Sequence, residues 1–379
     1  MELTDQQQMI LETVRRMAQE RVAPRAAEID DKDEYPWDLW TLFRDAGVLG
    51  VVFPEAYGGL GADHTTICLV VEELAKVSAA AAHIVFTCAS NISPVLIGGS
   101  ESLKARLLFR YAAEGGLAAL AITEPEAGSD VAAMQTMAKR VGDAYVLNGT
   151  KAMISNGDNA TIYSIFAKTD PDAGRRGISA FAVEAGTAGL TPGRHERKMG
   201  MRGSVLTSLT LEDVRVPVEN RLGEEGDGFR ICVESLNSAR LITAAHALGI
   251  AEGALDYARR YAMTRRQFGR PIAEFQGVQF LLADMATEVE AARALTYEAT
   301  RRYDRRDPDF VKFSAMAKLF TTDMAMQVTT DAVQVLGGYG YLKDHPVERM
   351  MRDAKVEQIW DGTNQIQRLL IGRLLTKEG

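Results

Sequence analysis

The chain has 379 residues, of which 46% are hydrophobic and 25% are charged. A chain of this length can bury more than one core, so we expect two or three cooperating domains. The net charge is −8, and lysine and arginine are scattered along the chain. This balance argues against a sequence-independent nucleic-acid-binding surface, so we expect no nucleic-acid partner.

The cysteines and histidines predict neither disulfides nor a metal site. Cys68, Cys88 and Cys232 are far apart in apolar surroundings, which is typical of buried, reduced thiols. The five histidines form no HxxxH or HExxH pair. The N-terminus lacks the basic and apolar regions of a signal peptide, and no run of about 18 apolar residues occurs. We expect a cytoplasmic protein without a membrane partner, or a matrix protein whose transit peptide has been removed.

The first third of the chain shows a helical period. Apolar residues recur every three or four positions between Asp5 and Ile29. Further helices are predicted at 37–46 and 65–77, in the alanine-rich segment that ends at Ile97, and at 102–113. The glycine-rich stretch "YGGLGAD" between them has neither the preceding strand nor the following lysine of a phosphate-binding loop, so it predicts a plain loop. We assign residues 1–116 to an N-terminal helical domain.

The middle of the chain changes to short runs rich in β-branched and aromatic residues. "ATIYSIFAKT" and "GISAFAVEA" are two of these runs, and glycine, aspartate, asparagine and proline separate them. This texture predicts an antiparallel β-domain over residues 117–228.

Helical periodicity then returns and continues to the end of the chain. Helices are predicted at 236–263, 275–303, 309–336 and 347–358, with Gly337 and Gly338 as a helix stop. We assign residues 229–379 to a C-terminal helical domain. The order of helices, strands and helices predicts a multi-domain α+β protein, and no internal repeat is present.

Two stretches carry polar groups that suit a ligand. "AITEPEAGSD", residues 121–130, offers the hydroxyls of Thr123 and Ser129, and Gly128 allows close backbone approach. Alone, this stretch fits an ordinary strand-end turn as well as a binding loop. Arg265 lies in "RRQFGR", where a solvated run of charge is the favoured interpretation on the residues alone.

A third stretch, "QIWDGTNQ" at residues 358–365, places one carboxylate between a tryptophan and a glycine. "DGTN" is strong turn chemistry, so on the residues alone Asp361 is first interpreted as the cap of a turn or of the following helix.

Two long patterns, more than 200 residues apart, resemble the signatures of the acyl-CoA dehydrogenase family. They are "AITEPEAGSD" and "QVLGGYGYLKDHPVERMMRD", and "KMGMRGS" and "RRQFGRPIAEFQGVQFLLADMA" between them are also similar to that family. The resemblance covers essentially the whole chain. It implies an FAD-dependent flavoprotein with an N-terminal helical domain, a central β-barrel-like domain and a C-terminal four-helix bundle, usually assembled as a homotetramer.

The resemblance also implies site residues, each at a position that matches the family patterns. Residues 120–123, including Leu120, Ile122 and Thr123, would line the flavin and thioester site with Ser129, while Met153, Ile154 and Ser155 would lie against the isoalloxazine. Arg265, Phe268 and Gln276 would hold the adenine dinucleotide part of FAD, Gln334, Gly337 and Gly338 would reach the FAD of a neighbouring subunit, and Thr363 and Gln365 would also contact FAD. Ser129, Asn237, Arg240 and Gly362 would contact the acyl-CoA substrate.

The same resemblance gives Asp361 a chemical role. It implies that a carboxylate removes the α-proton of an acyl-CoA thioester while the β-hydrogen passes as hydride to flavin N5. An α-proton is a weak acid, so we expect burial beside Ile359 and Trp360 to raise the pKa of Asp361. The backbone N–H of Asp361 would meet the enolate charge. Glu234 and Glu252, on the first long C-terminal helix, are the alternative bases.

Three departures from the family pattern lie around this cavity: Asp361 replaces a glutamate, Trp360 stands where tyrosine is frequent, and Met153 replaces a tryptophan. A shorter base leaves room for an α-branched or ring-bearing acyl group, as in dehydrogenases of alicyclic thioesters such as cyclohexanecarboxyl-CoA. Asn91 stands in the predicted acyl-pocket wall and supplies no second carboxylate, so dehydrogenation further round a ring is less supported.

Several other functions fit parts of the pattern. A straight-chain acyl-CoA dehydrogenase shares every motif, and nitroalkane oxidase resembles the family and uses an aspartate base. Ser129, Asn237 and Arg240 suit a CoA thioester and favour the dehydrogenase over the oxidase. A non-catalytic, nucleic-acid-associated flavoprotein would need a basic face, which the acidic charge balance argues against. For a dehydrogenase, we expect an electron-transfer flavoprotein as the electron acceptor.

Overall fold

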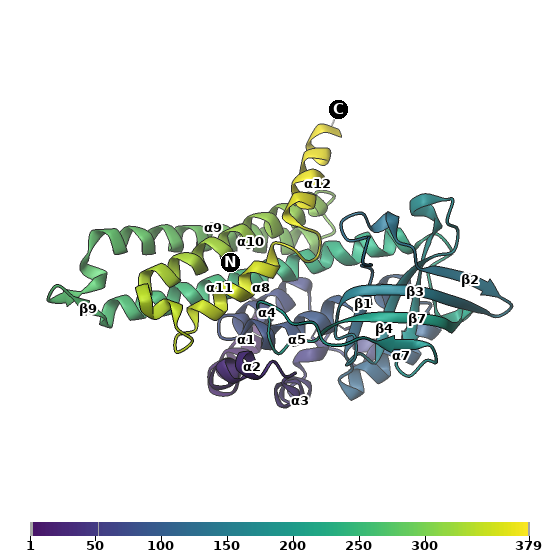
Figure 1. Cartoon of the computed structure of the whole chain (residues 1–379), viewed down its shortest axis with the longest axis horizontal. Helices are drawn as coiled ribbons and strands as arrows, with labels where there is room; N and C mark the ends of the chain where they lie inside the picture. Colours follow the sequence, from purple (N-terminus) through teal and green to yellow (C-terminus); the bar gives the residue numbers. More distant parts are fainter. Residues whose placement is uncertain (1–2, 52, 378–379) are drawn as a thin grey trace.

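The computed structural model describes residues 3–51 and 53–377, and three parts follow one another along the chain (Figure 1). The first part is helical. It contains α1 (Asp5–Met17), α2 (Ala26–Lys32), α3 (Trp37–Asp45), α4 (His64–Ala75), α5 (Ala79–Ser90), α6 (Ser93–Gly98) and α7 (Glu101–Glu114). Together with the sheet and the helices that follow, this order confirms the predicted α+β architecture.

The helix predicted from Asp5 to Ile29 is interrupted. Thr4 and Gln7 form a capping box at the start of α1, with the Gln7 amide donating to Thr4 Oγ1 at 3.2 Å. After α1 the chain passes through a π-helical turn, Ala18–Val22, and a 3₁₀ turn, Ala23–Arg25. Pro24 lies in the second turn, and because proline lacks an N–H it breaks the α-helical ladder there.

One apolar stretch qualifies the expectation about membrane spans. Ala79–Gly98, which covers α5 and α6, is long and apolar enough to cross a membrane by composition. However, 89% of its most apolar window is buried inside the protein, as in the core helix of a globular domain. Cys68, Cys88 and Cys232 are unpaired and buried, as the sequence predicts.

The middle part is one eight-stranded sheet. Its strands are β1 (Ala118–Ala121), β2 (Met137–Val141), β3 (Ala144–Ser155), β4 (Ile162–Lys168), β5 (Ile178–Glu184), β6 (Leu190–Pro192), β7 (Leu206–Pro217) and β8 (Arg221–Leu222). The order is β6-β7-β3-β2-β4-β5-β8, with β1 paired to β4. The β1–β4 and β2–β4 pairs are parallel, so the prediction of a purely antiparallel domain was wrong for these two pairs.

The last part contains long helices. They are α8 (Gly228–Thr264), α9 (Gln276–Asp304), α10 (Phe310–Leu336), α11 (Val347–Glu357) and α12 (Asn364–Lys377), with a small hairpin of β9 (Arg266–Gln267) and β10 (Arg270–Pro271) between α8 and α9. Gly337 has φ +59° and ends α10, as predicted. The helical period predicted no bounds for α12, which only the cap interpretation of Asp361 implied, and α12 projects away from the body of the molecule in Figure 1.

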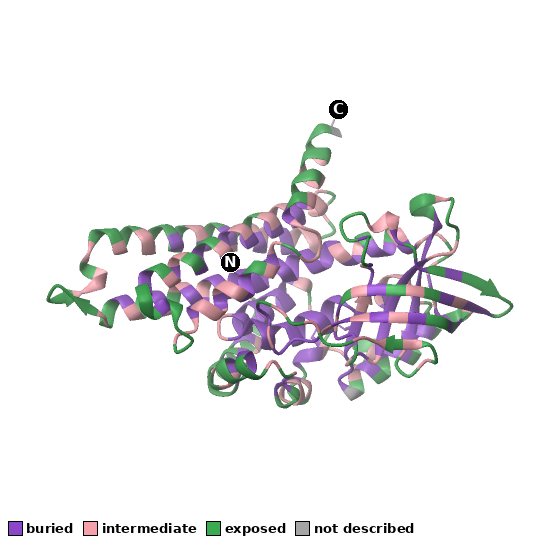
Figure 2. Ribbon diagram, viewed as in Figure 1, coloured by how far each residue is buried: buried purple, intermediate pink, exposed green. Residues whose placement is uncertain are grey.

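Helix α8 connects the three parts. Figure 2 shows its central turns buried, and α4, α5, α10 and α11 pack around them. The approach to α4 is close, because a Cβ atom at Gly249 would lie 2.2 Å from the carbonyl oxygen of Glu72. A rigid, buried helix therefore carries the residues from Asn237 to Thr243 to the loop between α11 and α12.

Candidate active site

Asp361 lies in the turn between α11 and α12. Its backbone is left-handed, with φ +52°, and Gly362 follows with φ +89°. Aspartate tolerates this region better than most residues, which agrees with the turn predicted from "DGTN". The cap interpretation was wrong, because Thr363 Oγ1, and not Asp361, accepts the hydrogen bond from the Ile366 amide in the first turn of α12.

The Asp361 carboxylate has one hydrogen-bond partner among the described residues. Thr243 on α8 donates its hydroxyl to Asp361 Oδ2 at 2.7 Å. The other carboxylate oxygen, Oδ1, accepts no hydrogen bond from the described part of the chain, and Asp361 as a whole residue is half-buried. One oxygen is thus fixed, and the other is open to a ligand.

Two cations lie beside this turn, but both bond to backbone carbonyls. Arg240 Nε donates to the Asp361 carbonyl oxygen at 3.4 Å, and Lys318 Nζ donates to the Gly362 carbonyl oxygen at 3.0 Å. Arg240 also bonds Asn237 Oδ1 at 2.6 Å, and Lys318 bonds Asn364 Oδ1 at 2.8 Å. These bonds hold the turn while leaving the carboxylate outside any ion pair.

The electrostatics follow from this arrangement. Burial raises the pKa of Asp361, and it outweighs the Thr243 hydrogen bond and the charges of Lys318 and Arg240, which act in the opposite direction. Burial also lowers the pKa of Lys318 to about 8 and lowers the pKa of Arg240. The expected rise at Asp361 is therefore confirmed. Burial by Ile359, one of the expected causes of this rise, is not confirmed, because Ile359 is 52% exposed and does not cover the carboxylate.

Trp360 is held by an aromatic and charged cluster. His83 stacks on its ring at 5.0 Å between centroids with an interplanar angle of 7°, and Phe86 meets it edge-on at 5.5 Å. The indole N–H donates to Glu357 Oε2 at 3.1 Å, and Glu357 Oε1 bonds His246 Nδ1 at 2.8 Å. Burial lowers the pKa of His83 to about 3, so His83 is a neutral ring. The Trp360 ring beside Asp361 is thus fixed by contacts with His83, Phe86 and Glu357.

A second group of predicted residues meets at the ends of β1 and β3. A bulge in β3 between Lys151 and Ile154 shifts the register with β7, and the Ala152 amide donates to the Thr123 carbonyl oxygen at 2.8 Å. At this bulge Met153 has φ +57° and is 65% exposed. Leu120, Thr123 and Ser155 are half-buried around it, Ile122 and Ile154 are buried, and Ser129 is exposed in the loop after β1.

A third group lies at the opposite end of the helical part. Arg265, Phe268 and Gln276 surround the β9–β10 hairpin, and Gln334, Gly337 and Gly338 lie at the end of α10. The two sets are neighbours, since the Arg265 guanidinium lies 5.0 Å from the ring centroid of Tyr339 in the turn after α10. Figure 1 shows this hairpin far from the β-domain. A single chain therefore does not bring this group to the one around Met153.

The alternative bases are engaged elsewhere. Glu234 pairs with Arg230 at 3.1 Å, and Glu252 pairs with Arg293 at 2.7 Å. Asn91 is buried and donates to the Ala118 carbonyl oxygen at 3.0 Å, so it acts as a structural tie between α5 and β1. Within residues 3–51 and 53–377, no cluster of three or more histidine, cysteine, aspartate or glutamate side chains is arranged to hold a metal.

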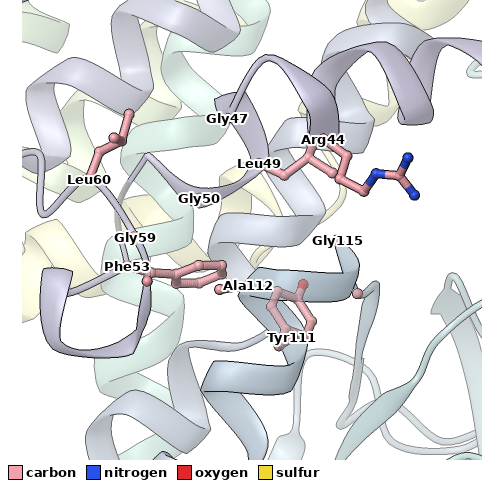
Figure 3. A pocket seen from close by; sticks show the side chains of 12 residues that line it. Arg44, Gly47, Leu49, Gly50, Phe53, Gly59, Leu60, Tyr111, Ala112 and Gly115 are labelled. Carbon is pink, nitrogen blue, oxygen red and sulfur yellow. The ribbon is translucent and has the colours of Figure 1, made fainter.

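A small cavity lies apart from these groups, between α3, α7 and the "YGGLGAD" loop (Figure 3). Its volume is about 90 Å³, and Leu49, Phe53, Gly59 and Tyr111 are among its lining residues. The Arg44 guanidinium points away from the cavity in Figure 3 and pairs with Asp45 at 2.8 Å. This cavity adds no group to the chemistry around Asp361.

Three family descriptions match the chain in order. They are the N-terminal domain of acyl-CoA dehydrogenases over residues 4–115, the middle domain over 119–214 and the C-terminal domain over 226–376. The chain belongs to the acyl-CoA dehydrogenase family. This confirms the resemblance found in the motifs and makes the protein an FAD-dependent oxidoreductase.

Individual acyl-CoA dehydrogenases and related structures are similar over the full length. Cyclohex-1-ene-1-carbonyl-CoA dehydrogenase of Geobacter metallireducens is 50% identical over 374 residues, which are 98% of both chains. The structure of butyryl-CoA dehydrogenase from Megasphaera elsdenii has a TM-score of 0.96 and 43% identity, covering 99% of both chains. A chain in a structure of the electron-transferring flavoprotein of Acidaminococcus fermentans has a TM-score of 0.95 and 45% identity, covering 99% of this chain and 98% of that one.

The predicted flavin residues of this acyl-CoA dehydrogenase chemically suit FAD. The bulge offers an exposed thioether, hydroxyls and backbone groups, which match an isoalloxazine ring with polar edges. At the distal hairpin, Arg265 suits a pyrophosphate, Phe268 is 93% exposed, and a Cβ atom at Gly337 or Gly338 would have no other atom within 4 Å. The two groups of predicted flavin residues thus lie at separate places on one chain.

The sequence missed Thr243, Lys318 and Gln367, although all three touch the Asp361 turn. Gln367 on α12 donates to the Gly362 carbonyl oxygen at 2.8 Å and to that of Asp361 at 3.3 Å. A threonine inside a long helix and a lysine among alanines carry no local signal. Only the packing of α8, α10 and α12 around one turn reveals them.

Proposed function

We propose that this acyl-CoA dehydrogenase acts on a ring-bearing or α-branched acyl-CoA and that Asp361 removes the α-proton. The observation that carries the proposal is the state of the Asp361 carboxylate. Its pKa is raised, one oxygen is open, and two neighbouring cations bond the backbone instead of the carboxylate. A base with these properties can accept a proton from a weak carbon acid.

The residues around Asp361 divide the work of the reaction. Oδ1 takes the proton, and Arg240 and Lys318 hold the turn so that this oxygen keeps its place. The Asp361 amide makes no hydrogen bond within the described chain, which leaves it free to meet the thioester oxygen as negative charge develops. Bound FAD, held by the groups around Met153 and Phe268, supplies the acceptor for the β-hydride.

Two observations support a cyclic acyl group. The wall that precedes the base is a tryptophan stacked on His83 with Phe86 at its edge, which offers a flat face to a ring. In addition, the 50% identical relative from Geobacter metallireducens is named for a cyclohexene thioester. The similarity to butyryl-CoA dehydrogenase, at 43% identity, makes a short straight-chain acyl-CoA the second candidate substrate.

Anaerobic flavin bleaching tests the substrate class. The purified enzyme is mixed with cyclohexanecarboxyl-, cyclohex-1-ene-1-carbonyl-, isobutyryl-, butyryl- and octanoyl-CoA, and the rate of flavin reduction is measured for each. We expect the fastest flavin reduction with a six-membered ring. Faster reduction by butyryl- or octanoyl-CoA than by every cyclic and branched thioester would overturn the cyclic assignment. Oxygen consumption with nitroethane would instead support an oxidase.

We also propose that the enzyme works as a homo-oligomer, with a tetramer as the expected form. One FAD can contact both the Met153 group and the Phe268 group only if two chains contribute, because a single chain keeps them apart. Electron transfer to an electron-transferring flavoprotein is supported by the 45% identical chain in the Acidaminococcus structure. The cytoplasmic location stays a prediction.

Light scattering of the FAD-loaded enzyme tests the assembly. We expect a mass of four chains, and Phe268→Ala together with Arg265→Ala should release FAD without changing the fold of a single chain. A monomer that retains stoichiometric FAD would contradict the shared site.

A further inference from the structure

Thr243 faces Asp361 from the buried middle of α8. Its side chain is fully buried, and its hydroxyl oxygen lies 2.7 Å from Asp361 Oδ2 and 3.1 Å from the carbonyl oxygen of Ala239 one turn earlier. A hydroxyl has one proton to donate. Thr243 can therefore donate either to the carboxylate or to its own helix, but not fully to both.

The geometry points to Thr243 as the positioning residue of the base: its hydroxyl holds Oδ2 of the ionised Asp361, leaves Oδ1 for the α-proton, and turns to the Ala239 carbonyl once the carboxyl group is neutral. This inference rests on the proposed function of Asp361. It assigns a further role to a residue of α8 that belongs to none of the motifs.

The proton balance of the step is simple. The α-carbon–hydrogen bond breaks, a bond forms between that proton and Oδ1, and the electron pair stays on the thioester. Hydrogen bonds to a charged acceptor are stronger than those to a neutral one, so the bond from Thr243 weakens when Asp361 takes up the proton. Because Ala239 offers a second acceptor at 3.1 Å, the buried hydroxyl is never left without a partner.

The other groups that face Asp361 do not duplicate this contact. Arg240 on α8, Lys318 on α10 and Gln367 on α12 all bond to the carbonyl oxygens of the turn. Glu357 on α11 bonds the Trp360 indole, and the remaining acid nearby, Asp323, bonds Asn364 at 2.7 Å. Thr243 alone among the described residues holds the carboxylate itself, so its removal frees the rotation of that group.

An aspartate suits this arrangement. Its side chain has two rotatable bonds against three in glutamate, and one hydrogen bond to Oδ2 fixes the carboxylate plane. The left-handed backbone at Asp361 is fixed in turn by Arg240 and Gln367. Hydrogen bonds therefore hold both the backbone and the carboxylate of Asp361. This fixes the direction of Oδ1, and proton transfer depends strongly on that direction.

Thr243→Val tests the inference, since valine keeps the shape and the β-branch but lacks the hydroxyl. In the FAD-loaded enzyme with a cyclic acyl-CoA, we expect the acid limb of kcat/KM to move up by about one pH unit and the plateau kcat to fall about tenfold. Thr243→Ser restores the hydroxyl and should return the acid limb to its wild-type position. The matched control is Thr329→Val on α10, a buried threonine whose hydroxyl donates to Ala325 at 2.7 Å.

The outcomes are separable. An unchanged acid limb and plateau in Thr243→Val, or an equal change in Thr329→Val, would overturn the role of Thr243 while Asp361 stays the base. A Thr243→Ser enzyme that behaves like Thr243→Val would do the same. If Asp361→Asn reduces flavin at the wild-type rate, the proposed function itself fails.

Discussion

Glu124 and Asp361 each lie near a buried lysine, and the two sites differ in which atoms the lysine bonds. Lys151 Nζ bonds Glu124 Oε1 at 2.7 Å, and both side chains are buried at the edge of the β-domain. Burial alone would raise the pKa of Glu124, but Lys151 and neighbouring amides lower it. Lys318 instead bonds the carbonyl of Gly362, and the pKa of the adjacent Asp361 is raised.

The difference separates a structural carboxylate from a chemical one. A direct ion pair keeps the charge of Glu124 and ties β1 to β3, since Lys151 also bonds the Ile122 carbonyl at 3.2 Å. At the other site the cations satisfy the backbone, which fixes the turn without quenching the basicity of Asp361. The chain therefore uses nearby positive charge in two ways that a sequence pattern does not distinguish.

The largest expected effect comes from removing the chemical carboxylate. Asp361→Asn keeps the shape and the acceptor for Thr243, so the protein should bind FAD and stay yellow. The rate of anaerobic flavin reduction by acyl-CoA should fall by about 10³- to 10⁴-fold, because no base takes the α-proton. Glu124→Gln, which alters the structural carboxylate, should retain most of the rate. Bleaching of Asp361→Asn at the wild-type rate would place the base elsewhere.

Breaking the structural pair should cost stability and not chemistry. Lys151→Met leaves Glu124 charged and buried, and we expect the free energy of unfolding to fall by about 3 kcal/mol. Thermal and urea denaturation of the holoenzyme measure this loss. The double variant with Glu124→Gln removes the stranded charge and should recover part of it. If Lys151→Met is as stable as the wild type, the pair of Lys151 and Glu124 does not stabilise the fold.

Removing Lys318 should affect the rate and its pH dependence. In Lys318→Met the Gly362 carbonyl keeps its bond from Gln367, and the base loses a nearby positive charge. We expect kcat to fall about fivefold and the acid limb to move to higher pH. The pKa of Lys318 is about 8, so this lysine is charged below pH 8 and neutral above it. The gap between variant and wild type should therefore shrink above pH 8, whereas Lys139→Met, at an exposed position on β2, should show no gap.

The smallest expected effect comes from replacing a third carboxylate, Asp353, whose pKa is raised although it has no catalytic role in this account. Asp353 on α11 is buried, accepts a hydrogen bond from the Met201 amide at 2.6 Å, and has its pKa raised by burial from 3.8 to about 6. The folded state binds a proton more tightly than the unfolded state, so this group adds stability below about pH 4 that is lost as pH rises through 6. Asp353→Asn keeps the acceptor and should raise the thermal midpoint at pH 7 by about 2 °C, with little change at pH 4. A larger gain at pH 4 than at pH 7 would reverse this sign.

Much of the fold follows from local patterns. The periods of the long helices, the stop at Gly337 and the strand-rich middle are properties of neighbouring residues, and the structure has them where the sequence predicts them. The parallel pairing of β1 with β4 was missed, and periodicity gave no bounds for the helix after Asp361, because register and a weakly patterned terminal helix depend on contacts with distant residues. The break near Pro24 carried a local signal that periodicity alone overlooked.

The motif residues of the site could be predicted from the sequence, whereas the residues that hold the Asp361 turn in place could not. Asp361, Arg240 and Asn237 come together as expected, since the family pattern marks them. Thr243 and Lys318 act through a turn more than 40 residues away, and no sequence spacing records such a contact. The separation of the Phe268 and Met153 groups was predicted only in part, because the resemblance assigned Gln334, Gly337 and Gly338, but not Phe268, to the FAD of a neighbouring subunit (Figure 1).

The most direct test is the pKa of Asp361 itself in the FAD-loaded, substrate-free enzyme. Infrared difference spectra of the carboxylic acid C=O stretch, wild type minus Asp361→Asn, follow this one group as pH is varied. We expect the titration midpoint of Asp361 to lie above the ordinary aspartate value of 3.8. Titration at or below 3.8 would show that Arg240 and Lys318 quench the carboxylate after all, and the distinction between the two sites would fall.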